Sequence, residues 1–532
     1  MKARPWLLLI LCAVVASAIA GAIGRLDATP ATPKPRVLRI AMNTSDLPTT
    51  TGAPSQGLEG LRFAGYPVFE PLVMWDLRVT DRIPGVIPWL AESWTVDAAD
   101  RNRWTFRLRR GVTFHDGSPF DADAVIWNLH RYFDTSAPQW DAAGGAWARS
   151  RAPILKSWEK IDDHTVVIST STPTSYFPEV LTTVLFVSPA RWRELKGDWQ
   201  AFAQRPAGTG AFRIDEVNRT AITMSRNPAY WNRARAAKVD GVKLYAMGEP
   251  TTRVAALRSG EVDWVENPPA DALPFLRKAG YQIATSPMPH VWAYFLRSRP
   301  GGPFHDLRVR QAMNYAIDRE GIVTLLNGAA RPAQGFWEPE DRRFGQPTNR
   351  YAYDPARSRA LLKAAGYPAD KLVPVRVLTT PVASGQMLSL PMNELLQQSA
   401  AKAGFKLEFM VVEGNQMNAM SRNDSPKMGD IDIYNKGYNT GESTYLYYWM
   451  YPPNIANYFD KASKELLDEY RVTFDPVERD AILLRLHERF VDDAPMAWVV
   501  HDVNPRAFAP NVRGYTPARS WYTDLTTIYL TD

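Results

Sequence analysis

The chain is poor in cysteine and in paired histidines. Its 532 residues include one cysteine, Cys12, which lies in an apolar N-terminal run. The mature chain is therefore expected to lack disulfides and thiol catalysis, so its stability has to come from the size of its core. None of the seven histidines has another at a spacing of three or four residues, the spacing of zinc ligands on a helix. Neither a metal site nor a cofactor is predicted.

Long apolar runs are confined to the N-terminus. Residues 1–24 begin with Lys2 and Arg4, continue through an apolar stretch and end in small residues, as a secretory signal peptide does. We expect residues 1–20 to be removed, and no lipid on Cys12 because the residue before it is not small. A membrane anchor is the alternative, since about 18 apolar residues can cross a bilayer. No later run is that long, so the mature chain is predicted to be soluble and periplasmic.

Neither sign of charge is in excess. Residues 1–20 hold two of the 62 basic residues and none of the 56 acidic ones, so the mature chain has a formal charge of +4. That charge is too small to indicate a nucleic-acid partner.

Two motifs resemble catalytic or phosphate-binding elements but lack essential parts. His115 is followed by Asp116 and Ser118, yet neighbours in sequence rarely reach triad geometry and no G-x-S-x-G is present. A turn after a strand is the favoured interpretation. The GTG run at 208–210 has no following Lys-Ser/Thr, so it is interpreted as a turn before the strand AFRI.

Apolar β-type runs and helical patterns alternate along the rest of the chain, which predicts an α/β fold. Residues 21–36 are interpreted as a proline-containing tether. Seven runs are expected as strands: 37–42, 104–109, 165–170, 221–226, 242–247, 375–380 and 406–412. Three helices are expected from capping aspartates and apolar periodicity: 306–319 after Asp306, 354–366 with Asp354 and Gly366, and 475–490 after Asp475.

Aromatic residues concentrate at 434–459, where nine of 26 residues are Tyr, Trp or Phe. Such side chains combine an apolar face with a polar edge, which suits a ligand cleft. Each single aromatic residue is equally compatible with a packed core. The stretch contains too much Asn, Gly and Pro for a plain strand or helix, so a ligand-lining loop is predicted.

The run at 83–134 resembles the signature of the peptide/nickel class (family 5) of extracellular solute-binding proteins, which serve ABC importers. The matching residues include Ser93-Trp94 and Phe114-His115-Asp116-Gly117. Further matches follow in order at GTGAFRI (208–214), SRNPAYW (225–231), VRQAMNYAIDREGIV (309–323), YDPARSRALLKAAGY (353–367) and VDDAPMAW (491–498). Together they cover nearly the whole mature chain.

This resemblance implies a two-lobed fold of the periplasmic-binding-protein type (type II, large peptide-binding class), with a split first lobe and a cleft between the lobes. Lobe 1 would comprise residues 37–288, with an inserted subdomain at about 79–206, and lobe 2 residues 289–496. Residues 497–532 would return to lobe 1. The crossings are expected near 287–292 and 497–502, with ligand binding shifting the chain towards a closed form.

The resemblance also implies a function: capture of a small organic solute in the cleft and its delivery to an ABC permease and ATPase in the inner membrane, by a monomer without enzymatic activity. Peptide-binding members carry an aspartate in a region that corresponds here to residues 437–441, which contain none; the nearest acid is Glu442. Oligopeptide or dipeptide binding therefore stays an alternative beside an opine, a sugar or an aromatic compound. A secreted hydrolase is an alternative from another class, and a chemoreceptor or chaperone role is untestable from sequence.

The candidate ligand contacts come from three places in the chain. We expect the 435–449 segment to form the wall of lobe 2, opposed by an early loop of lobe 1, with a side wall after Gly335. Aromatic faces would stack on the ligand and Asn amides would orient it. The candidates are Tyr66, Phe69, Trp337, Asn435, Tyr438, Asn439, Glu442 and Trp449.

Overall fold

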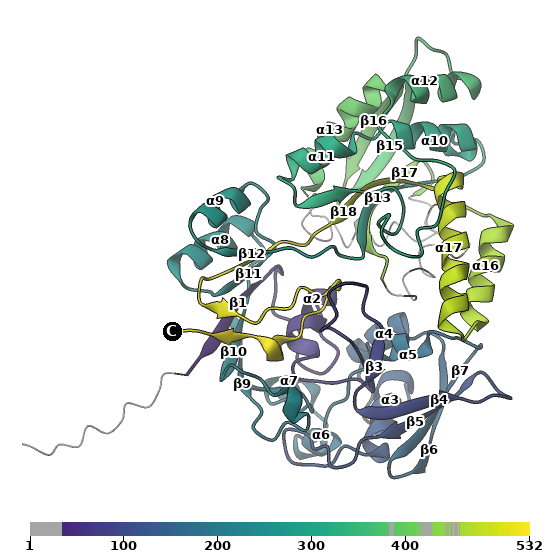
Figure 1. The fold of residues 1–532 in the computed structure, drawn as a ribbon. Coiled ribbons are helices and arrows are strands. Elements are labelled where there is room, and N and C mark those ends of the chain that lie inside the picture. The colour runs from purple at the N-terminus through teal and green to yellow at the C-terminus, as the bar shows by residue number, and fades with distance from the viewer. Residues whose placement is uncertain are drawn as a thin grey trace, which may run out of the picture. The chain divides into compact units, whose positions relative to one another are not determined.

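A computed structural model describes residues 35–381, 388–413, 416–417, 428–441 and 458–532, together with Met420, Ser443, Leu446, Tyr451 and Ala456. The first large sheet has seven strands in the order β12 (Gln282–Ala284), β19 (Arg506–Phe508), β11 (Trp264–Glu266), β1 (Val37–Met42), β10 (Gly241–Ala246), β9 (Ala221–Arg226) and β8 (Phe212–Val217) (Figure 1). The central strand β1 is parallel to both of its neighbours, and the outer pairs are antiparallel.

The seven-stranded sheet is buried on both faces because side chains alternate along β1. Leu38, Ile40 and Met42 join the largest apolar cluster, whereas Ala41 joins a smaller cluster with Leu257. The elements around this sheet are α2 (Gly57–Gly60), the π-helix η1 (Leu61–Gly65), η2 (Arg233–Arg235), α8 (Pro250–Ser259), α9 (Ala272–Lys278), β20 (Val512–Arg513), η5 (Leu525–Thr527) and β21 (Tyr529–Leu530).

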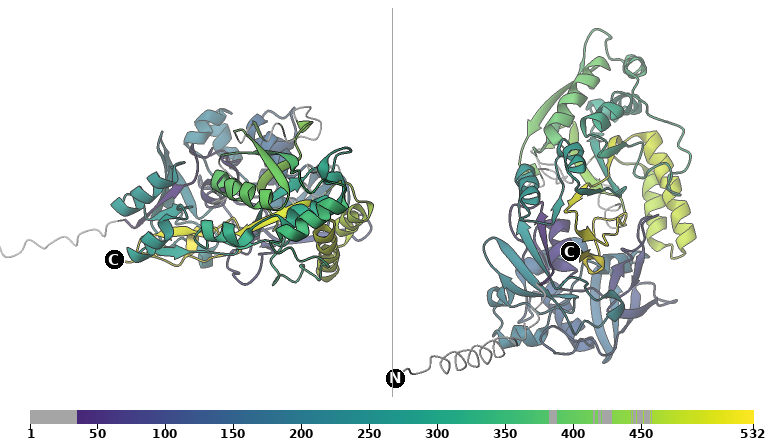
Figure 2. Two further views of the ribbon diagram at one scale, coloured as in Figure 1. Left: turned by 90° about the horizontal axis from the view of Figure 1, so that it is seen from above. Right: turned by 60° about the vertical axis from the view of Figure 1, so that its left-hand side comes forward.

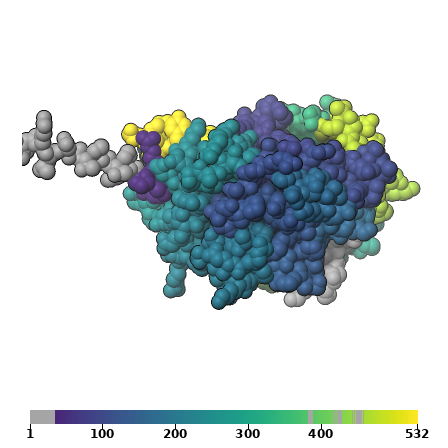
Figure 3. Space-filling model, turned by 90° about the horizontal axis from the view of Figure 1, so that it is seen from below, coloured from purple at the N-terminus to yellow at the C-terminus, as the bar shows by residue number. Residues whose placement is uncertain are grey.

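A smaller antiparallel sheet follows the first strand in sequence. Its order is β4 (Ala91–Val96), β5 (Arg103–Leu108), β7 (Thr165–Thr170) and β6 (Leu155–Asp162). The hairpin of β2 (Val73–Trp75) and β3 (Val86–Pro88) precedes it, and its helices are α3 (Ala122–Phe133), α4 (Ala142–Arg151), α5 (Phe177–Leu181), α6 (Pro189–Glu194) and α7 (Trp199–Gln204). Seen from below, one face of the molecule is formed mainly by the blue and teal residues of this region and of the first sheet (Figure 3).

The second large sheet has six strands in the order β14 (Ala330–Pro332), β18 (Met496–Asp502), β13 (His290–Leu296), β17 (Ile433–Asn439), β15 (Val373–Thr379) and β16 (Phe405–Val411). Its helices are η3 (Pro303–His305), α10 (Leu307–Tyr315), α11 (Arg319–Leu325), α12 (Pro355–Ala364), α13 (Ser389–Lys402), α16 (Lys461–Val472) and α17 (Pro476–Asp493). Tyr294 of β13 lies in one apolar cluster with Met313 and Leu396, whereas Phe295 lies in another with Phe336 and Phe490. Both faces of β13 are therefore covered.

The chain passes from the seven-stranded to the six-stranded sheet at residues 285–289 and returns at residues 503–505 (Figure 2). The two crossing segments are hydrogen-bonded side by side. Ser286 N donates to Val503 O at 2.9 Å, and Met288 N donates to Asp502 O at 3.0 Å. Paired short crossings of this kind are positions at which a hinge can act.

The predicted strands are confirmed. β1, β7 and β9 have the expected bounds, and β5, β10, β15 and β16 begin and end within two residues of them. Two predicted helix starts are also confirmed by their caps. The Asp354 carboxylate accepts from Arg357 N at 2.9 Å, and that of Asp475 accepts from Val477 N at 2.9 Å. Gly366 has φ 94°, the left-handed exit expected after α12.

The prediction of one helix over 306–319 is wrong in its second half. Asp306 caps α10 as expected, but that helix ends at Tyr315 and α11 begins at Arg319. Asp318 supplies a new cap by accepting from Gly321 N at 2.9 Å. The buried Arg319 guanidinium donates to four backbone carbonyl groups, including that of Tyr351 at 2.9 Å, and these bonds stabilise the break.

The prediction of a loop over 434–459 is wrong at its start, because Ile433–Asn439 is the strand β17 in the middle of the sheet. Its polar residue Asn435 is accommodated by hydrogen bonds: its Oδ1 accepts from Thr379 Oγ1 at 2.9 Å and from Asn393 Nδ2 at 3.2 Å. Tyr438 packs on the other face against Phe295 at 5.2 Å between ring centroids. A glycine and polar residues thus fit a strand whose neighbours satisfy them.

The motif at 114–118 is a turn, as predicted. His115 Nδ1 accepts from Gly208 N at 3.2 Å, and its Nε2 donates to Gly210 O at 3.0 Å, so this side chain joins the two turns that the sequence singled out. Burial lowers the pKa of His115 to about 4, so the ring is neutral. Across the described ranges, no helix combines the length and apolarity needed to cross a bilayer.

Candidate functional site

A cavity of about 520 Å³ lies between elements of the two halves of the fold. On one side it is lined by the hairpin β2–β3 and by α5. On the other side it is lined by the segment after β14, by residues that follow β17, and by α16 and α17. The lining residues are Trp75, 81–86, Glu179, 340–343, Gly441, Ser443, Tyr470, Pro476, Arg479, Asp480, Leu483 and Arg519. This volume suits a small organic molecule.

The cavity wall is rich in charge, and four of its arginines pair with acids of the same wall. Arg343 forms a two-pronged contact with Asp341, at 2.8 and 2.7 Å. Burial alone would raise the pKa of Asp341, but its bonds to Arg343 outweigh burial and hold it below its usual value. Arg342 pairs with Asp480. Five arginines and five carboxylates line the cavity in all, so its described wall is neutral overall.

Three nitrogen donors in this wall have no acceptor among the described residues. They are the indole Nε1 of Trp75 and the Nε atoms of Arg479 and Arg519. Trp75 is 4 % exposed, so its indole donor is shielded from bulk water. Buried donors need a hydrogen-bond partner, and each of these three atoms is enclosed by neighbouring protein atoms rather than open to the cavity.

The two candidates from the early loop lie outside this cavity. Phe69 is fully buried in the largest apolar cluster. Tyr66 packs edge-on against Tyr522 at 4.9 Å and lines a separate cavity of about 40 Å³ beside Glu70. That smaller volume has room for little more than one or two waters.

The candidates around β17 and Trp337 are also buried. Trp337 Nε1 donates to Thr440 O at 3.3 Å, and its ring lies under Arg343, a cavity residue, at 4.6 Å. Asn439 Oδ1 accepts from Gly441 N at 2.8 Å, directly beside the cavity wall. Tyr438 and Asn435 are 4 % and 2 % exposed, on opposite faces of the sheet.

Two further candidates, Glu442 and Trp449, lie outside the described residues. The neighbours of Glu442, namely Gly441 and Ser443, both line the cavity. The prediction of eight ligand contacts therefore stays a prediction. Sequence reasoning did not propose the charged wall, because its members come from six separate segments and none of them forms a local motif.

Glu70 is the most heavily bonded acid near the smaller cavity. Its carboxylate accepts from Trp89 Nε1 and Tyr230 OH at 2.7 Å, and from Thr209 Oγ1 and Trp231 Nε1 at 2.8 Å. Burial raises the pKa of Glu70 to about 7, although the four donors act in the opposite direction. The residue organises the first part of the chain, because its partners come from three distant segments.

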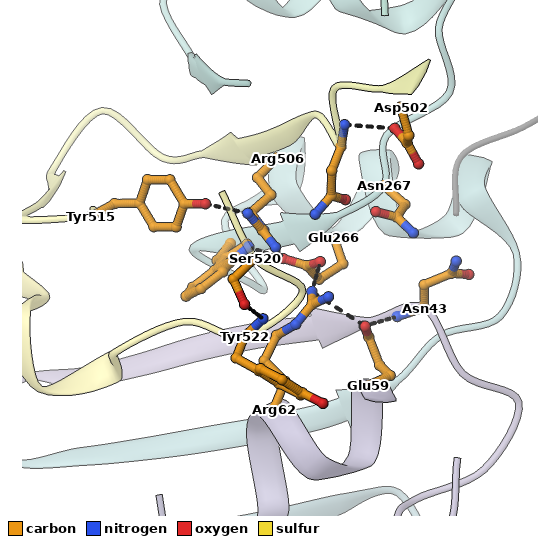
Figure 4. Close-up of polar contacts among 12 residues, drawn as sticks. Asn43, Glu59, Arg62, Glu266, Asn267, Asp502, Arg506, Tyr515, Ser520 and Tyr522 are labelled. Carbon is orange, nitrogen blue, oxygen red and sulfur yellow. Dashed lines mark hydrogen bonds and ion pairs between the residues drawn. The ribbon is translucent and has the colours of Figure 1, made fainter. Parts of the chain in front are cut away.

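A second buried polar cluster joins the first sheet to the C-terminal segment (Figure 4). Arg62 contacts both Glu59 and Glu266, and Glu59 accepts from Asn43 N at 3.0 Å. Burial raises the pKa of Glu59, whereas for Glu266 the two arginines outweigh burial and lower it. Within the described part of the chain, no group of three or more His, Cys, Asp or Glu side chains could hold a metal ion.

The chain is similar to known binding proteins by family model, by sequence and by structure. A family model for "Bacterial extracellular solute-binding proteins, family 5 Middle" matches residues 85–458. The chain is 27 % identical over 443 residues to the glutathione-binding protein GsiB of Escherichia coli K12, covering 80 % of this chain and 82 % of GsiB. It is 27 % identical over 508 residues to di/tripeptide-binding protein 2 of Pseudomonas aeruginosa, covering 90 % and 93 %. The structure of HbpA2 from Haemophilus parasuis matches with a TM-score of 0.79 at 22 % identity, over 93 % of this chain and all of that chain, which shows the two-lobed fold.

Proposed function

Because the chain belongs to family 5 of the bacterial extracellular solute-binding proteins, it is a binding protein and not an enzyme, and we propose that its 520 Å³ cavity holds the solute. The supporting observation is the polar, charge-paired wall built from both sides of the fold. A ligand enclosed in this way would contact both sides at once, so its binding energy would favour their approach.

The solute we propose is a small organic molecule that is polar and has no large net charge. The charges of the cavity wall already cancel, so an ion of one sign in the cavity would meet no excess of opposite charge. A buried unpaired charge of this kind costs several kcal/mol. Short peptides meet this description as zwitterions. They remain the leading alternative, and the names of two relatives refer to glutathione and to di- or tripeptides.

The lobe boundaries and hinge positions are also part of the proposal. The strand topology supports two lobes that meet at residues 285–289 and 503–505, with closure around these crossings. Residues predicted from sequence, such as Tyr66 and Trp337, would support the cavity wall from behind it. Alternatively, they would contact the solute only while the two lobes are apart. Glu442 stays a proposed contact, because its sequence neighbours Gly441 and Ser443 line the cavity.

Delivery to a membrane permease and its ATPase completes the proposed role. The apolar leader at residues 1–20 supports export to the periplasm and cleavage near Gly21, and we propose that the mature chain acts as a monomer. Intact-mass measurement of the exported protein tests the cleavage and the absence of a lipid on Cys12. A diacylglycerol-modified Cys12 would contradict this part.

The central experiment is native mass spectrometry of the purified protein, followed by thermal shift with glutathione, the dipeptide Met-Leu, an opine and a sugar. A solute that binds only the folded state at one hundred times its Kd stabilises it by about 2.7 kcal/mol. We expect one member of this panel, or a mass that copurifies, to raise the melting temperature without being chemically changed. Turnover of the solute would support the hydrolase alternative instead.

A further inference from the structure

The helical hairpin of α16 and α17 belongs to the second half of the fold but extends to the first. In Figure 1 it stands at the right of the six-stranded sheet, and its lower end reaches α5 and β7. The crossing segments at 285–289 and 503–505 run at the left of the same view. The two halves therefore also meet at this hairpin, away from the covalent crossings.

A polar network connects the hairpin to α5 at the cavity wall. Glu179 of α5 accepts from Arg479 Nη2 of α17 at 3.1 Å and from Ser443 Oγ at 2.6 Å. Arg479 Nη2 also donates to Tyr470 OH of α16 at 2.7 Å, and Ser443 Oγ lies 2.6 Å from that hydroxyl. All four side chains line the cavity. Glu179 is thus an acid of one half that receives donors from the other half.

Apolar contacts surround this network. Tyr176, beside α5, stacks on Tyr470 with centroids 5.9 Å apart and ring planes at 16°. Phe474, in the turn between the two helices, lies 5.9 Å from Trp104 of β5 and 5.0 Å from the Arg101 guanidinium. These rings place apolar surface beside the ion pair, and a less polar surrounding strengthens such a pair.

The backbone takes part as well, at the end of α16. Ser175 N donates to Arg471 O at 2.7 Å, and Ser175 Oγ donates to Tyr470 O at 3.0 Å. Carbonyl groups at a helix C-terminus need such donors, because no helical partner remains for them. The first half of the fold thus caps a helix of the second half.

We propose that Glu179, Ser443, Tyr470 and Arg479 form a latch that holds the α16–α17 hairpin against α5 and so closes one wall of the cavity. This proposal rests on the proposed function only in calling the cavity a solute site. Glu179 and Arg479 are each 18 % exposed, so the pair is shielded when formed but can be hydrated when the halves separate. The crossings permit the motion, and the latch residues set how much of the protein is closed.

The test measures the closed fraction without any solute. Spin labels at Ile161→Cys on β6 and Lys461→Cys on α16 report the distance between the halves by pulsed electron resonance, in a chain with Cys12→Ser. Both positions are well exposed, at 53 % for Ile161 and 83 % for the Lys461 side chain. We expect a short-distance population in the otherwise unchanged chain and, in Glu179→Ala, an about tenfold lower ratio of short to long distances.

Two further variants separate the latch from general packing. Glu469→Gln removes a charge from the same hairpin, where Glu469 pairs with Arg485 and contacts nothing on α5, and it should leave the distances unchanged. The exchange Glu179→Arg with Arg479→Glu should restore the short population that Glu179→Ala loses. An unchanged distribution in Glu179→Ala, an equal shift in Glu469→Gln, or no restoration by the exchange would each overturn the latch. Failure of every solute to bind would leave these distances as expected and would count only against the proposed function.

Discussion

Glu266, at the end of β11, accepts a hydrogen bond from Arg506 Nε at 2.8 Å, although 240 positions of sequence separate the two residues. They face each other in the β11–β19 pair, directly after the chain has returned from the second sheet. Arg506 also contacts Tyr515, so the acid, the arginine and the phenol fasten the C-terminal segment to the first sheet (Figure 4). Both charged side chains are at most 1 % exposed.

The first prediction concerns this pair. Glu266→Gln would leave Arg506 and Arg62 buried with less negative charge, so the free energy of unfolding should fall by about 3–5 kcal/mol. Urea denaturation followed by tryptophan fluorescence measures it. Glu159→Gln, at the exposed Arg103–Glu159 pair, is the control and should change little. Equal losses of unfolding free energy in the two variants would mean that the buried cluster stabilises the fold no more than an exposed ion pair does.

Much of the fold could be predicted from the sequence, because its signals are local. Apolar runs such as 37–42 became strands, and Asp354 and Asp475 capped helices through contacts within three residues. The break after Tyr315 and the strand β17 were missed because distant partners decide them. The guanidinium of Arg319 donates to the carbonyl of Tyr351, and the side-chain oxygen of Asn435 accepts from the hydroxyl of Thr379.

The candidate site was less predictable for the same reason. Ion pairs such as Arg479–Glu179 join residues 300 positions apart, and neither residue is unusual in its own segment. The aromatic-rich segment contains Gly441 and Ser443, which line the cavity, but aromatic density could not separate cavity wall from core. Tyr438 illustrates this, because it packs within the sheet core.

The second prediction uses Glu70. In Glu70→Gln one carboxylate oxygen becomes an amide NH₂, which would face a tryptophan N–H that cannot accept a hydrogen bond. Leaving these buried donors unpaired should lower the free energy of unfolding by about 1–3 kcal/mol. The loss should also depend on pH, because burial raises the pKa of Glu70 to about 7. Because the folded state holds the proton of Glu70 more tightly, this group stabilises the fold fully at pH values below its pKa in the unfolded chain. That stabilisation is lost as the pH rises to about 7.

The difference between the original chain and Glu70→Gln should therefore be larger at pH 5 than at pH 8, by about 2.5 kcal/mol. Urea denaturation at the two pH values measures this. Asp123→Asn, at an exposed position on α3, serves as the control for a general charge effect. An equal difference at the two pH values would show that Glu70 is ionised throughout this range.

The third prediction concerns acid stability. Burial lowers the pKa of His290 and His487 to about 3 and that of His501 to about 4, below the value near 6.5 of an unfolded chain. Although His290 Nδ1 lies 3.6 Å from Asp502, its ring is neutral. Stability from these groups is complete above pH 6.5 and is lost as pH falls. At pH 5.5 each of the three histidines should lower the free energy of unfolding by about 1.4 kcal/mol.

Unfolding in urea between pH 8 and pH 5.5 measures this slope. His487 Nε2 accepts from Phe336 N at 3.1 Å, and Nδ1 donates to Phe344 O at 2.7 Å, so His487→Gln keeps a donor and an acceptor without a titrating ring. The variant should lose less stability between pH 7 and pH 5.5 than the original chain. An identical slope would mean that His487 binds protons equally in the folded and the unfolded chain, so that burial does not lower its pKa.

The last prediction places the solute. Arg519 lines the cavity, and its Nη2 donates to Glu338 at 2.9 Å. Arg519→Ala should fold, because Glu338 keeps Arg331 as a partner at 3.0 Å. If the solute contacts the Arg519 side chain, calorimetry with glutathione or Met-Leu, whichever raises the melting temperature, should show a Kd about tenfold to hundredfold weaker. Arg219→Ala is the matched control, because this exposed arginine lines a separate groove of about 450 Å³. The same loss of affinity in Arg219→Ala, with Arg519→Ala silent, would move the site to that groove. If neither variant changes the Kd, the charged wall does not contact the solute, and the contacts predicted at Glu442 and Trp449 become the next to be changed.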